Sequence, residues 1–171
     1  DAKVIYDKGI TNIDEWNYAV VYNLGQYVHT EHALLFHPDG FVVNAKSWNP
    51  EWLTYDYIGA PWPMPSDDYS YRDVNGDIQR VGNSVGLRSK KLLDLPRKID
   101  MPWREYYGNT NEDGFISVHN RHLFEQHGCK FAPFEVALEF AREVPLPENN
   151  KIKPFMFHRY AGENLNYPKF I

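Results

Sequence analysis

The segment that decides the fold is Ala33-Leu34-Leu35-Phe36-His37-Pro38-Asp39-Gly40-Phe41-Val42-Val43, two apolar runs separated by a polar break. Four apolar residues in succession, 33–36, favour a central strand of a parallel sheet that is covered on both faces. Pro38 and Gly40 disfavour a continued strand, so we expect the chain to turn or loosen there. Asp39 then lies at the end of a strand, where ligands bind in open α/β sheets. A plain hairpin turn is the alternative, because Pro-Asp-Gly commonly forms turns.

The size and composition of the chain indicate one domain, residues 1–171, of an ordinary globular protein. The formal net charge is −5 and no long basic run is present, which argues against nucleic acid as a partner. Cys129 is the single cysteine, so no internal disulfide forms, and we predict a reducing, cytoplasmic location. No apolar run approaches the ~20 residues of a membrane span. The chain begins with Asp1, so either its start was removed or it belongs to a longer polypeptide.

The first third of the chain predicts a strand, a helix and a second strand. Residues 4–6 form a short strand candidate, and Thr11 or Asn12 is the expected cap of a helix from about Ile13 to Thr30. Apolar side chains recur there at a spacing of four, at Trp16, Val20, Leu24 and Val28. A parallel crossover into the strand at Ala33 would explain this order.

The rest of the chain predicts short elements around one long loop. We expect a helical turn at Pro50 capped by Asn49, a strand over 57–60 and a polar loop over 64–79. In the segment 81–89, two glycines and an asparagine within five residues indicate a backbone that lies close to another group or adopts positive φ angles. Ser89 is the expected cap of a helix that continues to about Leu95. A further helix over 112–127 ends at Gly128, and a last strand covers 154–158. On that helix, His119 and His122 are interpreted as solvated.

Three polar groups follow strands or occupy loops: Asp39, the pair Glu112 and Asp113, and His158. Two carboxylates and a histidine could bind Mn²⁺ or Mg²⁺, and such an ion could neutralise a diphosphate leaving group. The alternatives are a structural histidine at 158 and a favourable first helical turn at 112–113. The aromatic side chains of Trp62, Tyr57, Tyr69 and Tyr71 could stack on sugar faces, and the alternative for Trp62 is a place in the core or at its rim.

Four motifs together resemble a bacterial and viral family of glycosyltransferase-like domains that is similar to the GT-A class. They are Ala33-Leu34-Leu35-Phe36-His37-Pro38-Asp39-Gly40, Tyr55-Asp56-Tyr57-Ile58-Gly59-Ala60-Pro61-Trp62, Val81-Gly82-Asn83-Ser84-Val85-Gly86-Leu87-Arg88-Ser89 and Asn111-Glu112-Asp113. The likeness covers about residues 10–160, and its most specific part is the Asp-Tyr-Ile-Gly-Ala-Pro-Trp block. Enzymes of the GT-A class transfer a sugar from a nucleotide-diphosphate donor.

The resemblance implies an α/β fold, GT-A-like and Rossmann-like, with a mixed, mostly parallel sheet flanked by helices. With about 32 residues before Ala33, this fold is shortened at its N-terminus. Asp39 takes the place of the metal-binding second aspartate of Asp-x-Asp, and His158 that of a late histidine in the metal site. His37 stands at the first aspartate, where the family contacts ribose.

The resemblance also implies the other site residues. Asp113 would be the general base of an inverting transferase, with Glu112 holding the acceptor. The donor pocket would be lined by Gly82, Asn83 and Gly86 with Arg88 close by, and Tyr57 and Trp62 could stack on sugars. Ser84 and Val85 depart from the small residues usual in the family at these positions.

Two function hypotheses follow from these residues. The first is a metal-dependent glycosyltransferase that moves a sugar from a nucleotide-sugar donor to a glycan or another hydroxyl acceptor. The second is a non-catalytic module that binds a carbohydrate or a partner on a degenerate transferase fold, motivated by the short N-terminus and by His37. A phosphoesterase would need more metal ligands than the sequence offers.

Overall fold

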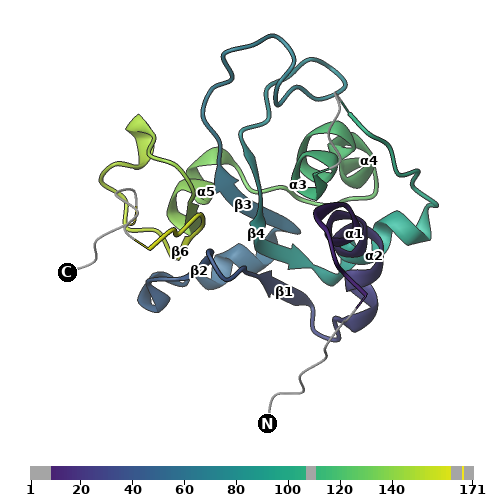
Figure 1. Ribbon diagram of the computed structural model, residues 1–171, viewed down its shortest axis with the longest axis horizontal. Coiled ribbons are helices and arrows are strands. Elements are labelled where there is room, and N and C mark those ends of the chain that lie inside the picture. Colours follow the sequence, from purple (N-terminus) through teal and green to yellow (C-terminus); the bar gives the residue numbers. More distant parts are fainter. Residues whose placement is uncertain (1–8, 107–110, 163–166, 168–171) are drawn as a thin grey trace.

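A computed structural model describes residues 9–106, 111–162 and 167, which form two small sheets with helices around them (Figure 1). The first sheet has the strand order β1-β4-β3, with β1 at His32–Leu35, β3 at Tyr57–Pro61 and β4 at Val81–Ser89. The second has the order β2-β6-β5, with β2 at Phe41–Val42, β5 at Ala141–Arg142 and β6 at Met156–Phe157. Among the pairings of these six strands, that of β5 with β6 is parallel and the others are antiparallel. One isolated parallel bridge joins Tyr57 to Phe131.

The prediction of a GT-A-like, mostly parallel Rossmann-like sheet is therefore wrong. Strand β1 is not central: it pairs only with β4, in antiparallel register with Leu34 opposite Leu87. As an edge strand it is only half-buried, and Phe36 directly after it is 63% exposed. A short apolar run does not indicate which strands will pair with it, so the run 33–36 is equally consistent with a central strand and an edge strand. The strand expected at residues 4–6 lies outside the described residues.

The helices were predicted more accurately than the sheet, because their capping residues can be recognised from the neighbouring sequence. The Asn12 side chain accepts a hydrogen bond from the Glu15 amide (2.9 Å) and caps α1 at Ile13–Tyr18, as predicted. The helix continues as a π-helical turn, Ala19–Asn23, and a 3₁₀ turn, Leu24–Tyr27. The Ser89 hydroxyl accepts from the Leu92 amide (3.0 Å) and caps α2 at Lys90–Lys98.

The second half of the chain supplies three more α-helices. The predicted helix over 112–127 is divided into α3 at Glu112–Gly114, a π-helical turn at Phe115–His119 and α4 at Arg121–Gln126. Gly128 follows with φ +77°, a left-handed conformation that ends a helix. The remaining elements are α5 at Phe134–Phe140 and the 3₁₀ turns Ala45–Ser47, Pro50–Thr54 and Pro147–Asn149. Among the described helices, none has the length and apolar character of a membrane span.

The first sheet is covered on both faces, because successive residues of β3 point to opposite sides. The Tyr57 side chain packs among residues of a helical layer formed by α2, α4 and the two π-helical turns, including Phe115 and Phe124. Ile58 packs on the other side with Phe140 of α5 and Met156 of β6. The second sheet therefore belongs to one cover of the first, and the two sheets meet near the end of β1 (Figure 1).

Candidate functional site

The His-Pro-Asp-Gly break forms a tight turn between the two sheets. The His37 amide donates to the Gly40 carbonyl (2.8 Å), and the Gly40 amide donates to the His37 carbonyl (3.0 Å). Pro38 and Asp39 occupy the tip, so the alternative of a hairpin turn is confirmed. This turn carries the chain from β1 of the first sheet to β2 of the second, and Asp39 lies where the sheets meet.

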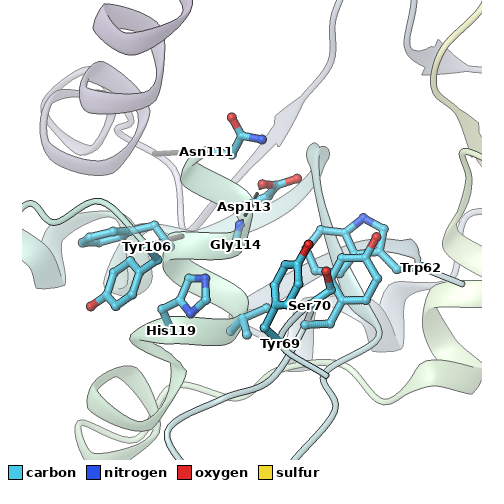
Figure 2. A pocket seen from close by; sticks show the side chains of 11 residues that line it. Trp62, Tyr69, Ser70, Tyr106, Asn111, Asp113, Gly114 and His119 are labelled. Atoms are coloured by element: carbon cyan, nitrogen blue, oxygen red, sulfur yellow. Dashed lines mark hydrogen bonds between the residues drawn. The ribbon is translucent and has the colours of Figure 1, made fainter. Parts of the chain in front are cut away.

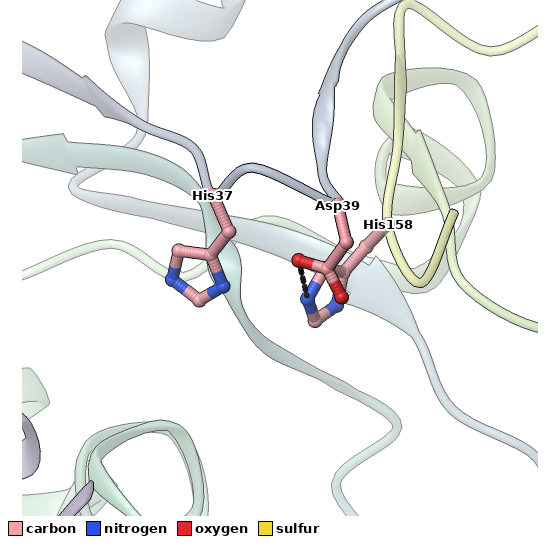
Figure 3. A group of neighbouring side chains, drawn as sticks. All are labelled: His37, Asp39 and His158. Carbon is pink, nitrogen blue, oxygen red and sulfur yellow. Dashed lines mark ion pairs between the residues drawn. The ribbon is translucent and has the colours of Figure 1, made fainter. Parts of the chain in front are cut away.

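The strand register then brings His158 to Asp39. Phe41 of β2 pairs with Phe157 of β6, so the next residues outward, Gly40 and His158, are neighbours. A Cβ on Gly40 would lie 2.6 Å from Cδ2 of His158, so only glycine leaves room for this ring. His158 Nε2 is 3.7 Å from Asp39 Oδ1, and the His37 and His158 rings meet edge to face with centroids 5.2 Å apart (Figure 3).

His37, Asp39 and His158 fit a divalent cation. Each offers one ligand atom, and these three atoms lie within 4.8 Å of one another. His37 Nε2 and His158 Nδ1 are buried, and neither has a hydrogen-bond partner among the described residues. Burial, assisted by the charge of His158, lowers the pKa of His37 and so favours the neutral imidazole, which is the form that binds metals.

A second feature is a cavity of about 370 Å³ beside α3, in which the Asp113 carboxylate lies among aromatic side chains (Figure 2). On one wall the Trp62 and Tyr71 rings stack with centroids 4.7 Å apart and planes 17° apart. On the other, Tyr106 and His119 stack at 4.2 Å and 9°. The cavity thus lies between the long loop after β3 and the helical segment that begins at residue 112, and residues of both line it.

The Asp113 carboxyl exchanges its proton close to neutrality. Burial is the main cause that raises its pKa to about 7, and the negative charges of Glu112 and Glu143 act in the same direction. The Gly114 amide, which donates to Asp113 Oδ1 (2.7 Å), and the Arg88 charge partly oppose the shift. A half-buried carboxyl with this pKa can take up or release a proton under physiological conditions.

Two of the three candidate cation ligands are linked electrostatically to Asp113 of the cavity, each through a glutamate. Glu112 acts on the pKa values of both His37 and Asp113. Glu143 acts on Asp113 and lies 3.7 Å from His158 Nδ1. Asp39 and His158 are not among the described residues that line the cavity.

Three of the residues expected to bind substrate, Tyr57, Asn83 and Arg88, are buried supports instead. The Arg88 guanidinium is 1% exposed and donates to the carbonyls of Ile58 (Nη1, 2.8 Å) and Asn83 (Nη2, 2.6 Å). It also lies 3.6 Å from the centroid of the fully buried Tyr57 ring. Asn83 itself adopts φ +91°, and its side-chain oxygen accepts from the Val85 amide. We therefore assign Tyr57, Asn83 and Arg88 to the support of the sheet, not to ligand contact.

The glycines and Glu112 also differ from expectation. A Cβ on Gly82 would lie 1.9 Å from the Trp62 indole, and one on Gly86 would lie 2.2 Å from the Ile58 carbonyl oxygen. Close packing against β3 and Trp62 accounts for both glycines without a ligand. Glu112, expected to hold the acceptor, is 2% exposed, and its Oε1 has no hydrogen-bond partner among the described residues.

Sequence reasoning missed three residues of the site: Tyr106, His119 and Glu143. His119 was interpreted as solvated, but it lines the cavity, and burial lowers its pKa. Its spacing of four from the buried Phe115 is the signal that could have identified it. Nothing in the sequence marks Glu143, because its position depends on the pairing of two-residue strands.

No curated protein and no solved structure matches the chain significantly. A family model described as "Protein of unknown function (DUF5672)" matches residues 11–158, which is most of the chain. The chain therefore belongs to the DUF5672 family.

Proposed function

We propose that the protein transfers a sugar from a nucleotide-diphosphate donor to an acceptor hydroxyl, with Asp113 as the general base. The observation that carries the proposal is the Asp113 carboxyl, whose pKa of about 7 is raised by burial in a 370 Å³ cavity. General bases work best when their pKa lies near the operating pH. The volume is within the range of small-molecule sites, about 300–1,000 Å³.

The aromatic walls support a sugar as the group that enters this cavity. Trp62 and Tyr71 form one stacked pair, and Tyr69 lines the cavity as well. Flat aromatic faces bind the apolar faces of sugar rings, while hydroxyl and carboxylate groups can hold the sugar hydroxyls. Ser70, Asn111 and Asp113 supply such polar groups around the same space.

In the proposed step, Asp113 takes up the proton of the acceptor hydroxyl while the hydroxyl oxygen forms a bond to the anomeric carbon. The bond between that carbon and the phosphate oxygen breaks, and its electron pair leaves with the nucleoside diphosphate. Attack opposite the leaving group inverts the anomeric configuration. The transition state resembles an oxocarbenium ion, as in glycoside hydrolysis.

His37, Asp39 and His158 would hold a divalent cation on the side of the leaving group. When bound, such an ion supplies positive charge that stabilises the departing diphosphate. The electrostatic link through Glu112 and Glu143 supports a common site, because each affects the pKa of Asp113 and also lies near one of the two histidines.

A second candidate function is non-catalytic binding of a carbohydrate. The stacked aromatic pairs on both walls favour it, because stacking alone can hold a glycan. The first sheet also favours it, because its three described strands pair in antiparallel fashion, whereas nucleotides in open α/β sheets bind at parallel crossover units.

Thermal unfolding with a panel of nucleoside diphosphates and nucleotide sugars, each with and without Mn²⁺, separates the two functions. We expect a donor to raise the melting temperature in the presence of Mn²⁺ and much less in its absence, since a ligand that binds only the folded state stabilises it. Oligosaccharides tested in parallel provide the comparison. Stabilisation by oligosaccharides and by no nucleotide would exclude transfer and favour the binding module.

A further inference from the structure

We propose that Glu143 positions His158 for metal binding, and that the site formed by His37, Asp39 and His158 selects a first-row transition-metal ion over Mg²⁺. This inference rests on the cation site of the proposed function. Neither the role of Glu143 nor the choice of ion follows from the motifs of the sequence. Both follow from the strand registers and from the chemistry of the three ligands.

Two strand pairings place Glu143 beside His158. In the parallel pairing of β5 with β6, Arg142 lies opposite Phe157, so the next residues along are Glu143 and His158. The His158 amide donates to the Arg142 carbonyl (3.0 Å), which extends this register to the histidine. On the other side of β6, the antiparallel pairing with β2 leads to Gly40. His158 is therefore held between the Asp39 turn and Glu143.

The two ring nitrogens of His158 face different carboxylates. Nε2 is 3.7 Å from Asp39 Oδ1, and Nδ1 is 3.7 Å from Glu143 Oε1. Glu143 is well shielded, with 15% of its side chain exposed, whereas 49% of the Asp39 side chain is exposed. A metal-bound histidine usually donates its other ring N–H to a carboxylate, which sets the tautomer and the ring orientation. Glu143 would accept from Nδ1–H and leave the Nε2 lone pair free beside Asp39.

Nδ1 of His158 is in a position that requires such a partner. It is buried and has no hydrogen bond among the described residues, and 3.7 Å to Glu143 is slightly beyond hydrogen-bond length. A small rotation of the ring, of the kind that an ion beside Nε2 would impose, closes this gap. Glu143 Oε1 also forms an ion pair with Nη1 of Arg159 at 3.9 Å, which is a second interaction that orients its carboxylate.

The ligand set determines which ion is favoured. Two imidazoles and one carboxylate offer two nitrogen atoms and one carboxylate group within 4.8 Å. Mg²⁺ prefers oxygen ligands, whereas imidazole suits transition-metal ions, whose affinity rises from Mn²⁺ through Co²⁺. We therefore expect the site to bind Mn²⁺, to bind Co²⁺ more tightly, and to discriminate against Mg²⁺.

The test is direct titration of the whole chain with Mn²⁺, monitored by the electron paramagnetic resonance signal of the free ion and without any sugar donor. We expect one Mn²⁺ to bind, equimolar Co²⁺ to displace it, and a large excess of Mg²⁺ to leave it bound. Glu143→Gln keeps the size of the side chain but removes its charge. It should raise the Kd for Mn²⁺ about 10- to 100-fold, as is usual for partners of metal-bound histidines.

Glu139→Gln is the matched control, because Glu139 lies on α5 with an exposed side chain and the same change is made four residues away. Its Kd should equal that of the wild type, and both variants should melt at the wild-type temperature without metal. The inference is overturned if Mn²⁺ does not bind, if Mg²⁺ displaces it as readily as Co²⁺, or if the two variants bind alike. Because no donor is used, metal binding without donor stabilisation would refute only the proposed function.

Discussion

Replacing Asp113 with asparagine is expected to reduce sugar transfer by about 10²- to 10⁴-fold, the usual contribution of a positioned general base. The amide cannot take up the proton of the acceptor hydroxyl, while its size preserves the walls of the cavity. The wild-type rate should rise with pH through about 7, where the Asp113 carboxyl loses its proton. The measurement is kcat/KM against pH for the wild type and Asp113→Asn.

The same variant should be more stable than the wild type at alkaline pH. Because the pKa of Asp113 is raised from 3.8 to about 7 on folding, the folded state binds this proton more tightly than the unfolded state. The stability that this proton contributes is complete below about pH 4 and is lost as the pH rises through about 7. Asparagine never ionises, so the advantage of Asp113→Asn in free energy of unfolding should grow over this interval.

Two outcomes would refute the assignment of Asp113. Full turnover by Asp113→Asn would exclude it as the base, and a stability difference that is independent of pH would exclude a raised pKa. Asp77→Asn is a suitable control, because Asp77 is an exposed aspartate in the loop before β4. It should change neither the rate nor the pH dependence of stability.

Replacing Arg88 with methionine is expected to lower the free energy of unfolding by about 3–5 kcal/mol, because buried carbonyls left without their donors cost about 1–3 kcal/mol each. The buried carbonyls of Ile58, Leu87 and Asn83 would lose the donors of the guanidinium. The Tyr57 ring would lose the cation 3.6 Å above it. Thermal or denaturant unfolding at pH 7 measures the loss, which for a chain of this length corresponds to roughly 10 °C in melting temperature.

Arg88→Met should also act on the cavity, because the Arg88 charge lowers the pKa of Asp113. Without that charge the rise of kcat/KM should shift to higher pH. The control is Arg97→Met at the end of α2, since this exposed guanidinium has one long contact of 3.3 Å with Asn23. Equal stability of the two variants would contradict a supporting role for Arg88 and would favour the earlier expectation that it contacts the ligand.

The features that depend on neighbouring residues were predictable. The caps at Asn49 and Ser89 were predicted correctly, and Asn12 is one of the two residues predicted for the first cap. In each cap a side-chain oxygen accepts from an amide two or three residues further on. The end of α4 shortly before Gly128 was predictable because glycine readily adopts the left-handed conformation that ends a helix. These interactions are complete within a few residues, so the sequence contains the whole signal.

The features that depend on strand partners were not predictable. The apolar run at 33–36 carries no information on whether β1 lies at the centre or at the edge of a sheet, and the structure places it at the edge. The structure brings Asp39 and His158 together with His37, for which the resemblance implied a contact with ribose. Glu143 escaped notice because two-residue strands have no periodic pattern.

The turn at Pro38 and Asp39 has a mechanical consequence for the small second sheet. Strands β2, β5 and β6 have two residues each, so few backbone hydrogen bonds hold this sheet together. An ion shared by Asp39 and His158 would act as a clamp between segments that are far apart in the chain and would oppose local opening. Occupancy of the site by an ion and the stability of the second sheet would therefore be coupled, and removal of the ion would loosen the strand that carries His158.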